Sequence, residues 1–145
     1  MATSMRELAR SLESLPDYAE FYIVLFSTNF IEPPMQKGWT RARKSAVRQV
    51  VRWLSQLDPN GGTQPRTAFL QVFSLTVRPD VIFFMTDGQV QDFTAEECAT
   101  LNDRGKRTVI NTIAFGDPSS QDLLKEIARQ SGGLYRFVPS QGGGP

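Results

Sequence analysis

The feature that most constrains the fold is a continuous apolar run, Val81 to Met85, which ends abruptly at Thr86-Asp87-Gly88. An unbroken apolar run suits a strand buried on both faces, as parallel strands covered by helices are. Gly88 allows the chain to turn sharply just after the strand. In open α/β sheets, ligands bind at the carboxyl ends of the strands. The run therefore predicts a buried parallel strand with the Asp87 carboxylate at a ligand-binding edge.

Strand-like runs alternate with helical patterns along the chain, which is typical of a parallel sheet with helices on its faces. Strands are predicted over residues 20–27, 80–86, 108–115 and 134–138. Helices are predicted over residues 4–15, 42–57, 65–75, 94–102 and 119–130. The fold class is therefore α/β, with an open, mainly parallel sheet and helices on both faces in a Rossmann-like three-layer sandwich.

Length and composition fit one domain over residues 1–139, followed by a flexible glycine-rich tail over residues 140–145. A formal net charge of +1 gives no long-range field of either sign, so nucleic acid is not an expected partner. No segment is apolar for long enough to span a membrane, and no signal peptide begins the chain. We expect a cytoplasmic protein, unless a longer gene product carries a signal or an anchor.

Two residue types limit the chemistry. Cys98 is the only cysteine and histidine is absent, which excludes an internal disulfide, a conventional zinc site and a histidine acid–base pair. Cys98 lies in a predicted helix with no histidine to activate it, so an inert thiol is expected there.

A second polar loop, Asn60-Gly61-Gly62-Thr63, precedes a predicted helix. Its threonine hydroxyl can converge with Asp87, and a carboxylate with a hydroxyl suits a hard cation. The alternative is purely structural: Asp87 would be a turn residue that accepts backbone hydrogen bonds, and Thr63 a helix cap. Asp117, after another predicted strand, either faces the same edge or starts a turn with Pro118.

Nearly the whole chain resembles a von Willebrand factor type A domain. The resemblance rests on the order and spacing of Gly-Gly-Thr and Thr-Asp-Gly, on the predicted strand from Phe21 to Ser27, and on the segment from Thr112 to Asp117. The resemblance implies a metal-ion-dependent adhesion site, built from an Asp-x-Ser-x-Ser loop, a threonine and an aspartate. Thr63 matches the threonine and Asp87 the aspartate. The implied cofactor is Mg2+, with Mn2+ or Ca2+ as alternatives, and the implied partner is a protein that supplies an acidic side chain.

The chain departs from that family because it contains no Asp-x-Ser-x-Ser and opens on a helix. The first strand, which the family places in the middle of the sheet, and its serine loop are missing. The metal site is therefore expected to be incomplete, with metal binding weak or absent. The open slot is expected to be filled by sheet rearrangement, by self-association or by a strand from a partner.

The predicted function is a non-enzymatic protein-interaction module of the adhesion type. One alternative is a magnesium-dependent phosphotransferase or hydrolase that uses Asp87, although the chain has no phosphate-binding loop of the Gly-x-x-x-x-Gly-Lys-Ser/Thr type. Another is a metal-free structural scaffold.

Two further features can each be interpreted in two ways. A basic stripe, defined as Arg41, Arg43, Lys44, Arg48 and Arg52, is either a solvated helix face or a contact for phosphate or an acidic partner. The partly apolar loop over residues 28–40 either covers the sheet edge or meets a partner.

Overall fold

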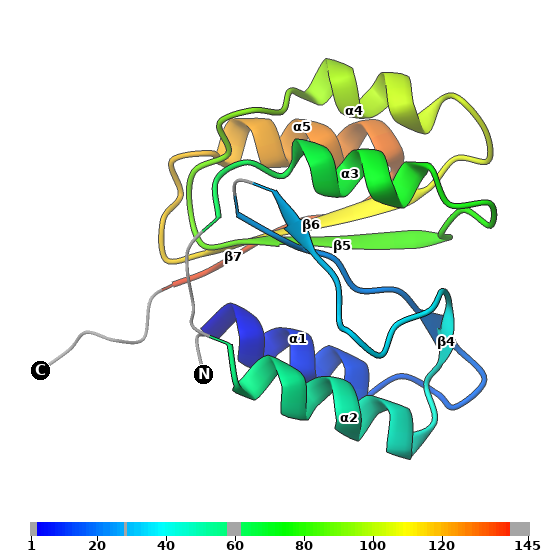
Figure 1. Cartoon of the computed structure of the whole chain (residues 1–145). Helices are drawn as coiled ribbons and strands as arrows, with labels where there is room; N and C mark the ends of the chain where they lie inside the picture. Colours follow the sequence, from blue (N-terminus) through cyan, green and yellow to red (C-terminus); the bar gives the residue numbers. More distant parts are fainter. Residues whose placement is uncertain (1–2, 28, 58–61, 140–145) are drawn as a thin grey trace, which may run out of the picture. The chain divides into compact units, whose positions relative to one another are not determined.

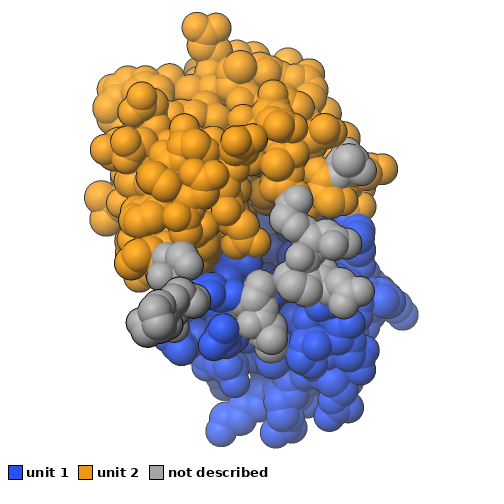
Figure 2. Space-filling view, turned by 90° about the vertical axis from the view of Figure 1, so that its left-hand side faces the viewer, with its two compact units in different colours: residues 1–25, 31–60 blue, residues 26–30, 61–145 orange. Residues whose placement is uncertain are grey.

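The computed structural model describes residues 3–27, 29–57 and 62–139. The chain forms two compact units, coloured separately in Figure 2. The first unit takes residues 1–25 and 31–60, and the second takes residues 26–30 and 61–145. The predicted tail over residues 140–145 lies outside the described residues, and the single domain over residues 1–139 stays a prediction.

The first unit is built on two helices, α1 (Thr3–Glu13) and α2 (Lys44–Ser55), which pack against each other. Apolar side chains recur every three or four residues in both helices, so each has one apolar face. The short strand β1 (Glu20–Phe21) pairs antiparallel with β4 (Thr40–Arg41). The buried core of this unit consists of Leu12, Phe21, Ile23, Ala42, Val47, Val50 and Leu54.

The strand predicted over residues 20–27 is wrong as one continuous strand. β1 ends at Phe21, residues 22–24 belong to no strand, and β2 (Leu25–Phe26) pairs with β3 (Phe30–Ile31) in a separate sheet. The apolar run over residues 21–26 indicated burial, but it carries no information about which strand is the partner.

The Gln36 side chain explains the interruption at Ile23. The Ile23 N–H donates to Gln36 Oε1, and Gln36 Nε2 donates to the Ile23 carbonyl oxygen, each at 2.9 Å. A side-chain amide therefore satisfies the backbone groups that a neighbouring strand would otherwise bond. Part of the loop over residues 28–40 thus folds back onto its own unit.

The second unit holds a parallel sheet in the order β5 (Val81–Thr86), β6 (Val109–Phe115) and β7 (Tyr135–Val138). Helices α3 (Arg66–Phe73), α4 (Ala95–Asn102) and α5 (Gln121–Ser131) lie together on one side of this sheet (Figure 1). These elements match the predicted ones to within a few residues, and the α/β fold class is confirmed. No helix among the described residues is both long and apolar enough to cross a membrane.

The two faces of β5 differ. Phe84 is buried in an aromatic cluster, with its ring centroid 4.9 Å from that of Phe69, which in turn stacks 4.6 Å from Phe93. On the opposite face, Val81 is 43% exposed and Phe83 is 57% exposed. The prediction of burial on both faces is therefore wrong for β5. Among the described strands only β6 pairs with β5, so β5 lies at the edge of its sheet.

Local sequence signals define two helix ends in this unit. The Thr94 hydroxyl accepts a hydrogen bond from the Glu97 N–H at 3.1 Å, which caps the start of α4, and donates to the Glu97 carboxylate at 3.2 Å. Gly132 ends α5 in the left-handed conformation, with φ of 85°, where a residue with a Cβ would be strained.

Candidate functional site at the sheet edge

The turn after β5 is closed by Thr86. The Gly88 N–H donates to the buried Thr86 hydroxyl oxygen at 3.2 Å. The Asp87 side chain is exposed, and its carboxylate accepts no hydrogen bond from the described residues. The interpretation of Asp87 as an acid that accepts backbone hydrogen bonds therefore does not describe its side chain. The turn therefore leaves the Asp87 carboxylate at the carboxyl end of the strand without a partner in the described part of the chain.

Thr63 joins the preceding loop to the chain that follows Asp87. Its hydroxyl donates to Gln91 Oε1 at 3.0 Å, and its carbonyl oxygen accepts from the Gln91 N–H at 2.7 Å. Because the hydroxyl proton is used by Gln91, the lone pairs on the Thr63 oxygen stay available as acceptors.

The interpretation of Thr63 as a helix cap is wrong. The N-cap of α3 is Pro65, which makes no side-chain cap bond. The first N–H of that helix, on Arg66, instead donates to Asp92 Oδ1 at 3.2 Å. The carboxylate of a distant loop thus satisfies the end of α3.

Gly62 is required by a close backbone approach. A Cβ on Gly62 would lie 2.0 Å from the carbonyl oxygen of Phe26. The neighbouring Gln64 N–H donates to the Ser27 carbonyl oxygen at 3.2 Å. A side chain at position 62 would therefore push the Thr63 loop away from the segment at residues 26–27. The remaining loop residues, Asn60 and Gly61, lie outside the described residues.

Asp117 both starts a turn and faces the same sheet edge as the Asp87 turn. Its Oδ1 accepts from the Ser119 N–H at 2.9 Å, so it starts a turn. Its Oδ2 also lies 3.2 Å from the position that a Cβ on Gly88 would take, so it faces the same edge as the Asp87 turn. Adjacent parallel strands bring these two aspartates to one end of the sheet.

Two residues of this edge were missed by sequence reasoning. Gln91 binds Thr63, and Ser120 Oγ accepts from the Val90 N–H at 3.0 Å. Both are uncharged polar residues in loops, a type too common to stand out in a sequence.

The oxygen donors of this edge suit a hard cation better than a zinc ion. The described residues contain no group of three or more His, Cys, Asp or Glu side chains that could hold a metal ion.

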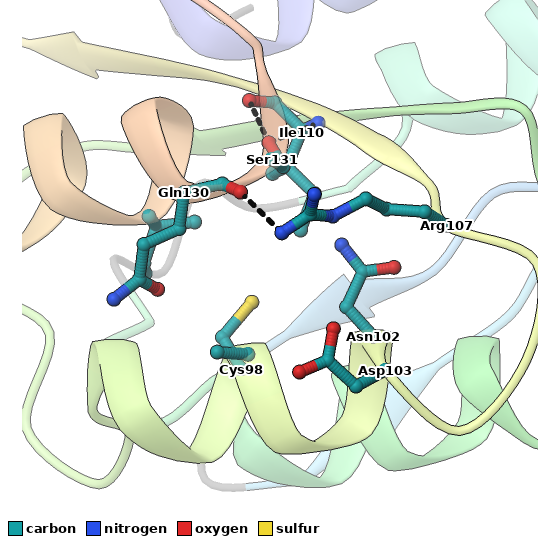
Figure 3. Close-up of a pocket in the computed structure, with 9 residues that line it drawn as sticks. Cys98, Asn102, Asp103, Arg107, Ile110, Gln130 and Ser131 are labelled. Carbon is teal, nitrogen blue, oxygen red and sulfur yellow. Dashed lines mark hydrogen bonds between the residues drawn. The ribbon is translucent and has the colours of Figure 1, made fainter.

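The only cysteine lies elsewhere and is inert. Cys98 is buried, and burial raises the pKa of its thiol to about 12. It lines a cavity of about 10 Å³ between α4 and α5, shown in Figure 3, where Arg107 donates to the Gln130 carbonyl oxygen at 2.9 Å. Substrate pockets are typically about 300 Å³ or larger, so this cavity is too small for a substrate. The prediction of an inert thiol is confirmed.

The basic stripe is exposed along its whole length. Arg41 lies in β4 and Arg43 is the N-cap of α2, while Lys44, Arg48 and Arg52 follow one line along that helix. This arrangement agrees with a solvated helix face.

The sequence pattern of the von Willebrand factor type A domain matches residues 4–137. Two curated relatives, von Willebrand factor A domain-containing protein 5A of Rattus norvegicus and of Mus musculus, are each 30% identical over 133 residues. These matches cover 88% of this chain and 16% of each relative. The chain therefore spans about a sixth of the length of the curated relatives that it matches.

Solved structures agree on the fold. A von Willebrand factor type A structure from Catenulispora acidiphila is similar with a TM-score of 0.76 and 16% identity, covering 93% of this chain and 33% of that chain. Proximal thread matrix protein 1 from the mussel byssus is similar with a TM-score of 0.65 and 15% identity, covering 93% of this chain and 35% of that chain. At such identities the likeness shows the fold alone.

Proposed function

Because the chain belongs to the von Willebrand factor type A family, we propose that it is a non-enzymatic module for protein–protein interaction. The observation that carries this proposal is the exposed Asp87 carboxylate, which has no hydrogen-bond partner among the described residues and stands where parallel sheets bind ligands. An exposed acid without a hydrogen-bond partner among the described residues is better suited to binding than to holding the fold together.

We propose Mg2+ as the cofactor, with Mn2+ or Ca2+ as substitutes, held by Asp87 and Thr63. No described residue donates a hydrogen bond to the Asp87 carboxylate, and the Thr63 oxygen keeps its lone pairs because its proton goes to Gln91. Mg2+ readily retains several waters, so two protein ligands suffice for weak binding. The bound cation would supply a positive charge that accepts an acidic side chain from a partner protein.

Surface plasmon resonance on an immobilised glutamate-containing peptide tests this function. We expect the chain to bind in Mg2+ and to dissociate in EDTA, and Asp87→Ala to abolish the binding. Asp103→Ala is the matched control, because Asp103 is an exposed aspartate that follows the last turn of α4 and is not a proposed ligand. Equal binding by the wild type and Asp87→Ala would reject the adhesion site.

The free edge of β5 supports a second mode of association. Val81 and Phe83 are exposed, the strand carries no charge or proline, and no described strand pairs with its outer edge. Such an edge is a template for another strand. We propose that two copies pair through β5, which analytical ultracentrifugation can test: Phe83→Lys should convert a dimer to a monomer. A wild type that stays monomeric at high concentration would contradict this pairing.

The enzyme alternative gains no observation in its favour, because the Asp87 edge carries no phosphate-binding loop in this sequence. Equal background hydrolysis of a phosphate ester by the wild type and Asp87→Ala would remove it. A metal-free scaffold would show no response to cations.

A reducing compartment such as the cytoplasm fits a chain whose single thiol is buried.

A further inference from the structure

A groove of about 450 Å³ runs between α3 and α4, entirely within the second unit. Its floor is apolar: Phe93 is 4% exposed, Leu101 is partly buried, and Leu70 is 41% exposed. A volume of this size can take several side chains of a ligand. Neither Thr63 nor Asp87 lines it, so the groove is distinct from the sheet edge.

The charges in this groove fall into two classes. Arg66 and Glu97 form an ion pair with each other, and Glu97 is also held by Thr94, so these charges are satisfied internally. Glu96 and Arg104 also line the groove, are exposed, and have no side-chain partner among the described residues. The groove therefore presents one available carboxylate and one available guanidinium.

The spacing of these two charges selects the shape of a partner. Glu96 lies in the first turn of α4, and Arg104 follows shortly after the helix ends at Asn102. The C-cap Asp103 keeps near-helical backbone angles, so the rise from Glu96 to Arg104 is close to that of eight helical residues, about 12 Å. A partner helix lying along α4 would therefore need opposite charges about eight residues apart.

The orientation of that helix follows from its own dipole. In an antiparallel helix, the acid facing Arg104 comes near the N-terminus and the base facing Glu96 comes near the C-terminus. Each charge is then at the favourable end of the helix dipole. A parallel helix would place both charges at the unfavourable ends.

We propose that the α3–α4 groove binds a short amphipathic helix of a partner protein, packed antiparallel to α4. The helix carries an acid for Arg104, a base eight residues later for Glu96, and large apolar side chains between them that pack on Leu70. This surface goes beyond the metal-dependent edge, because neither the floor nor the charges involve a cation.

The probe is a stapled helical peptide of about twelve residues, with aspartate and lysine eight positions apart and leucines three, four and seven positions after the aspartate. The staple keeps the peptide helical, since isolated helices of that length are marginal in water. Fluorescence anisotropy should show saturable binding to the wild type, and Leu70→Glu and Arg104→Glu should each weaken it by about tenfold or more.

The decisive control is a charge swap. A peptide with its aspartate and lysine exchanged should bind the double variant Glu96→Lys, Arg104→Glu better than it binds the wild type. Arg48→Glu, the same charge change on an exposed residue of the other unit, should leave binding unchanged, as should EDTA and Asp87→Ala. Failure of the sheet-edge function would thus leave this result intact. No saturable binding at millimolar peptide, or equal affinity for Leu70→Glu and the wild type, would overturn the proposal.

Discussion

The Asn102 side-chain amide exchanges two hydrogen bonds with the backbone of Thr108. Asn102 Nδ2 donates to the Thr108 carbonyl oxygen, and the Thr108 N–H donates to Asn102 Oδ1, each at 2.8 Å. The Thr108 hydroxyl donates in turn to the Pro79 carbonyl oxygen at 2.8 Å. Both residues are buried, so the network ties the end of α4 to the starts of β5 and β6. It thereby fixes the pair of strands whose other ends carry Asp87 and Asp117.

Asn102→Ala should lower the free energy of unfolding by about 2–4 kcal/mol, because it leaves two buried backbone groups of Thr108 without partners. Urea unfolding followed by circular dichroism measures this loss. Thr100→Ala, which removes an exposed hydroxyl from the same helix, should cost less than about 1 kcal/mol. Equal losses for the two variants would show that the Asn102 network does not stabilise the strand pair.

The Cys98 thiol should make stability depend on pH in alkaline solution. Burial raises its pKa from 9.0 to about 12, so between these values the unfolded chain releases a proton that the folded chain keeps. The free energy of unfolding should therefore fall as pH rises through this window, by about 1.4 kcal/mol per pH unit from this group.

The measurement compares the wild type with Cys98→Ala, so that only the contribution of this thiol differs between the two pH profiles. The alanine variant should show a shallower fall in stability above pH 9.0. Parallel pH profiles would contradict the burial of this thiol, as would fast reaction of the folded chain with a thiol reagent at neutral pH.

The basic stripe lowers the stability of α2. This helix has no acid in its first turn and no side-chain N-cap bond, and Lys44, Arg48 and Arg52 are like charges four residues apart. Lys44→Glu should raise the free energy of unfolding by about 0.5–1.5 kcal/mol, because it adds a favourable charge at the N-terminus and an ion pair with Arg48. Thermal unfolding at low salt measures the gain.

Lys44→Gln is the matched control, since it relieves repulsion but adds neither the charge nor the ion pair. Its gain should be smaller than that of Lys44→Glu, and the difference should shrink at high salt. A loss of stability in Lys44→Glu would mean that the stripe is already balanced by acids within the fold.

Local patterns predicted the elements of the second unit well. The Thr94-x-x-Glu97 cap pattern before α4 and the apolar runs of β5 and β6 are short-range signals, so they can be read without knowing the fold. The same signals failed at residues 20–27, because the Gln36 amide that interrupts this segment lies beyond the reach of a local pattern.

The candidate site was predictable only in part. The acid and glycine at the end of β5 indicated Asp87, and both the polar loop at residues 60–63 and the family resemblance indicated Thr63. The clamp between Thr63 and Gln91 could not be predicted, because it joins residues 28 positions apart through a neutral side chain. Exposure of Phe83 was missed for a related reason: an apolar run does not reveal whether another element covers each face of the strand.

The most direct test of a cation site at the sheet edge is thermal unfolding with and without millimolar Mg2+. Because a ligand that binds only the folded state stabilises it, we predict that Mg2+ raises the Tm of the wild type. The shift should vanish in Asp87→Ala, shrink in Thr63→Val and persist in Asp103→Ala. An unchanged Tm of the wild type, or a shift of the same size in Asp87→Ala, would contradict a cation site at Thr63 and Asp87.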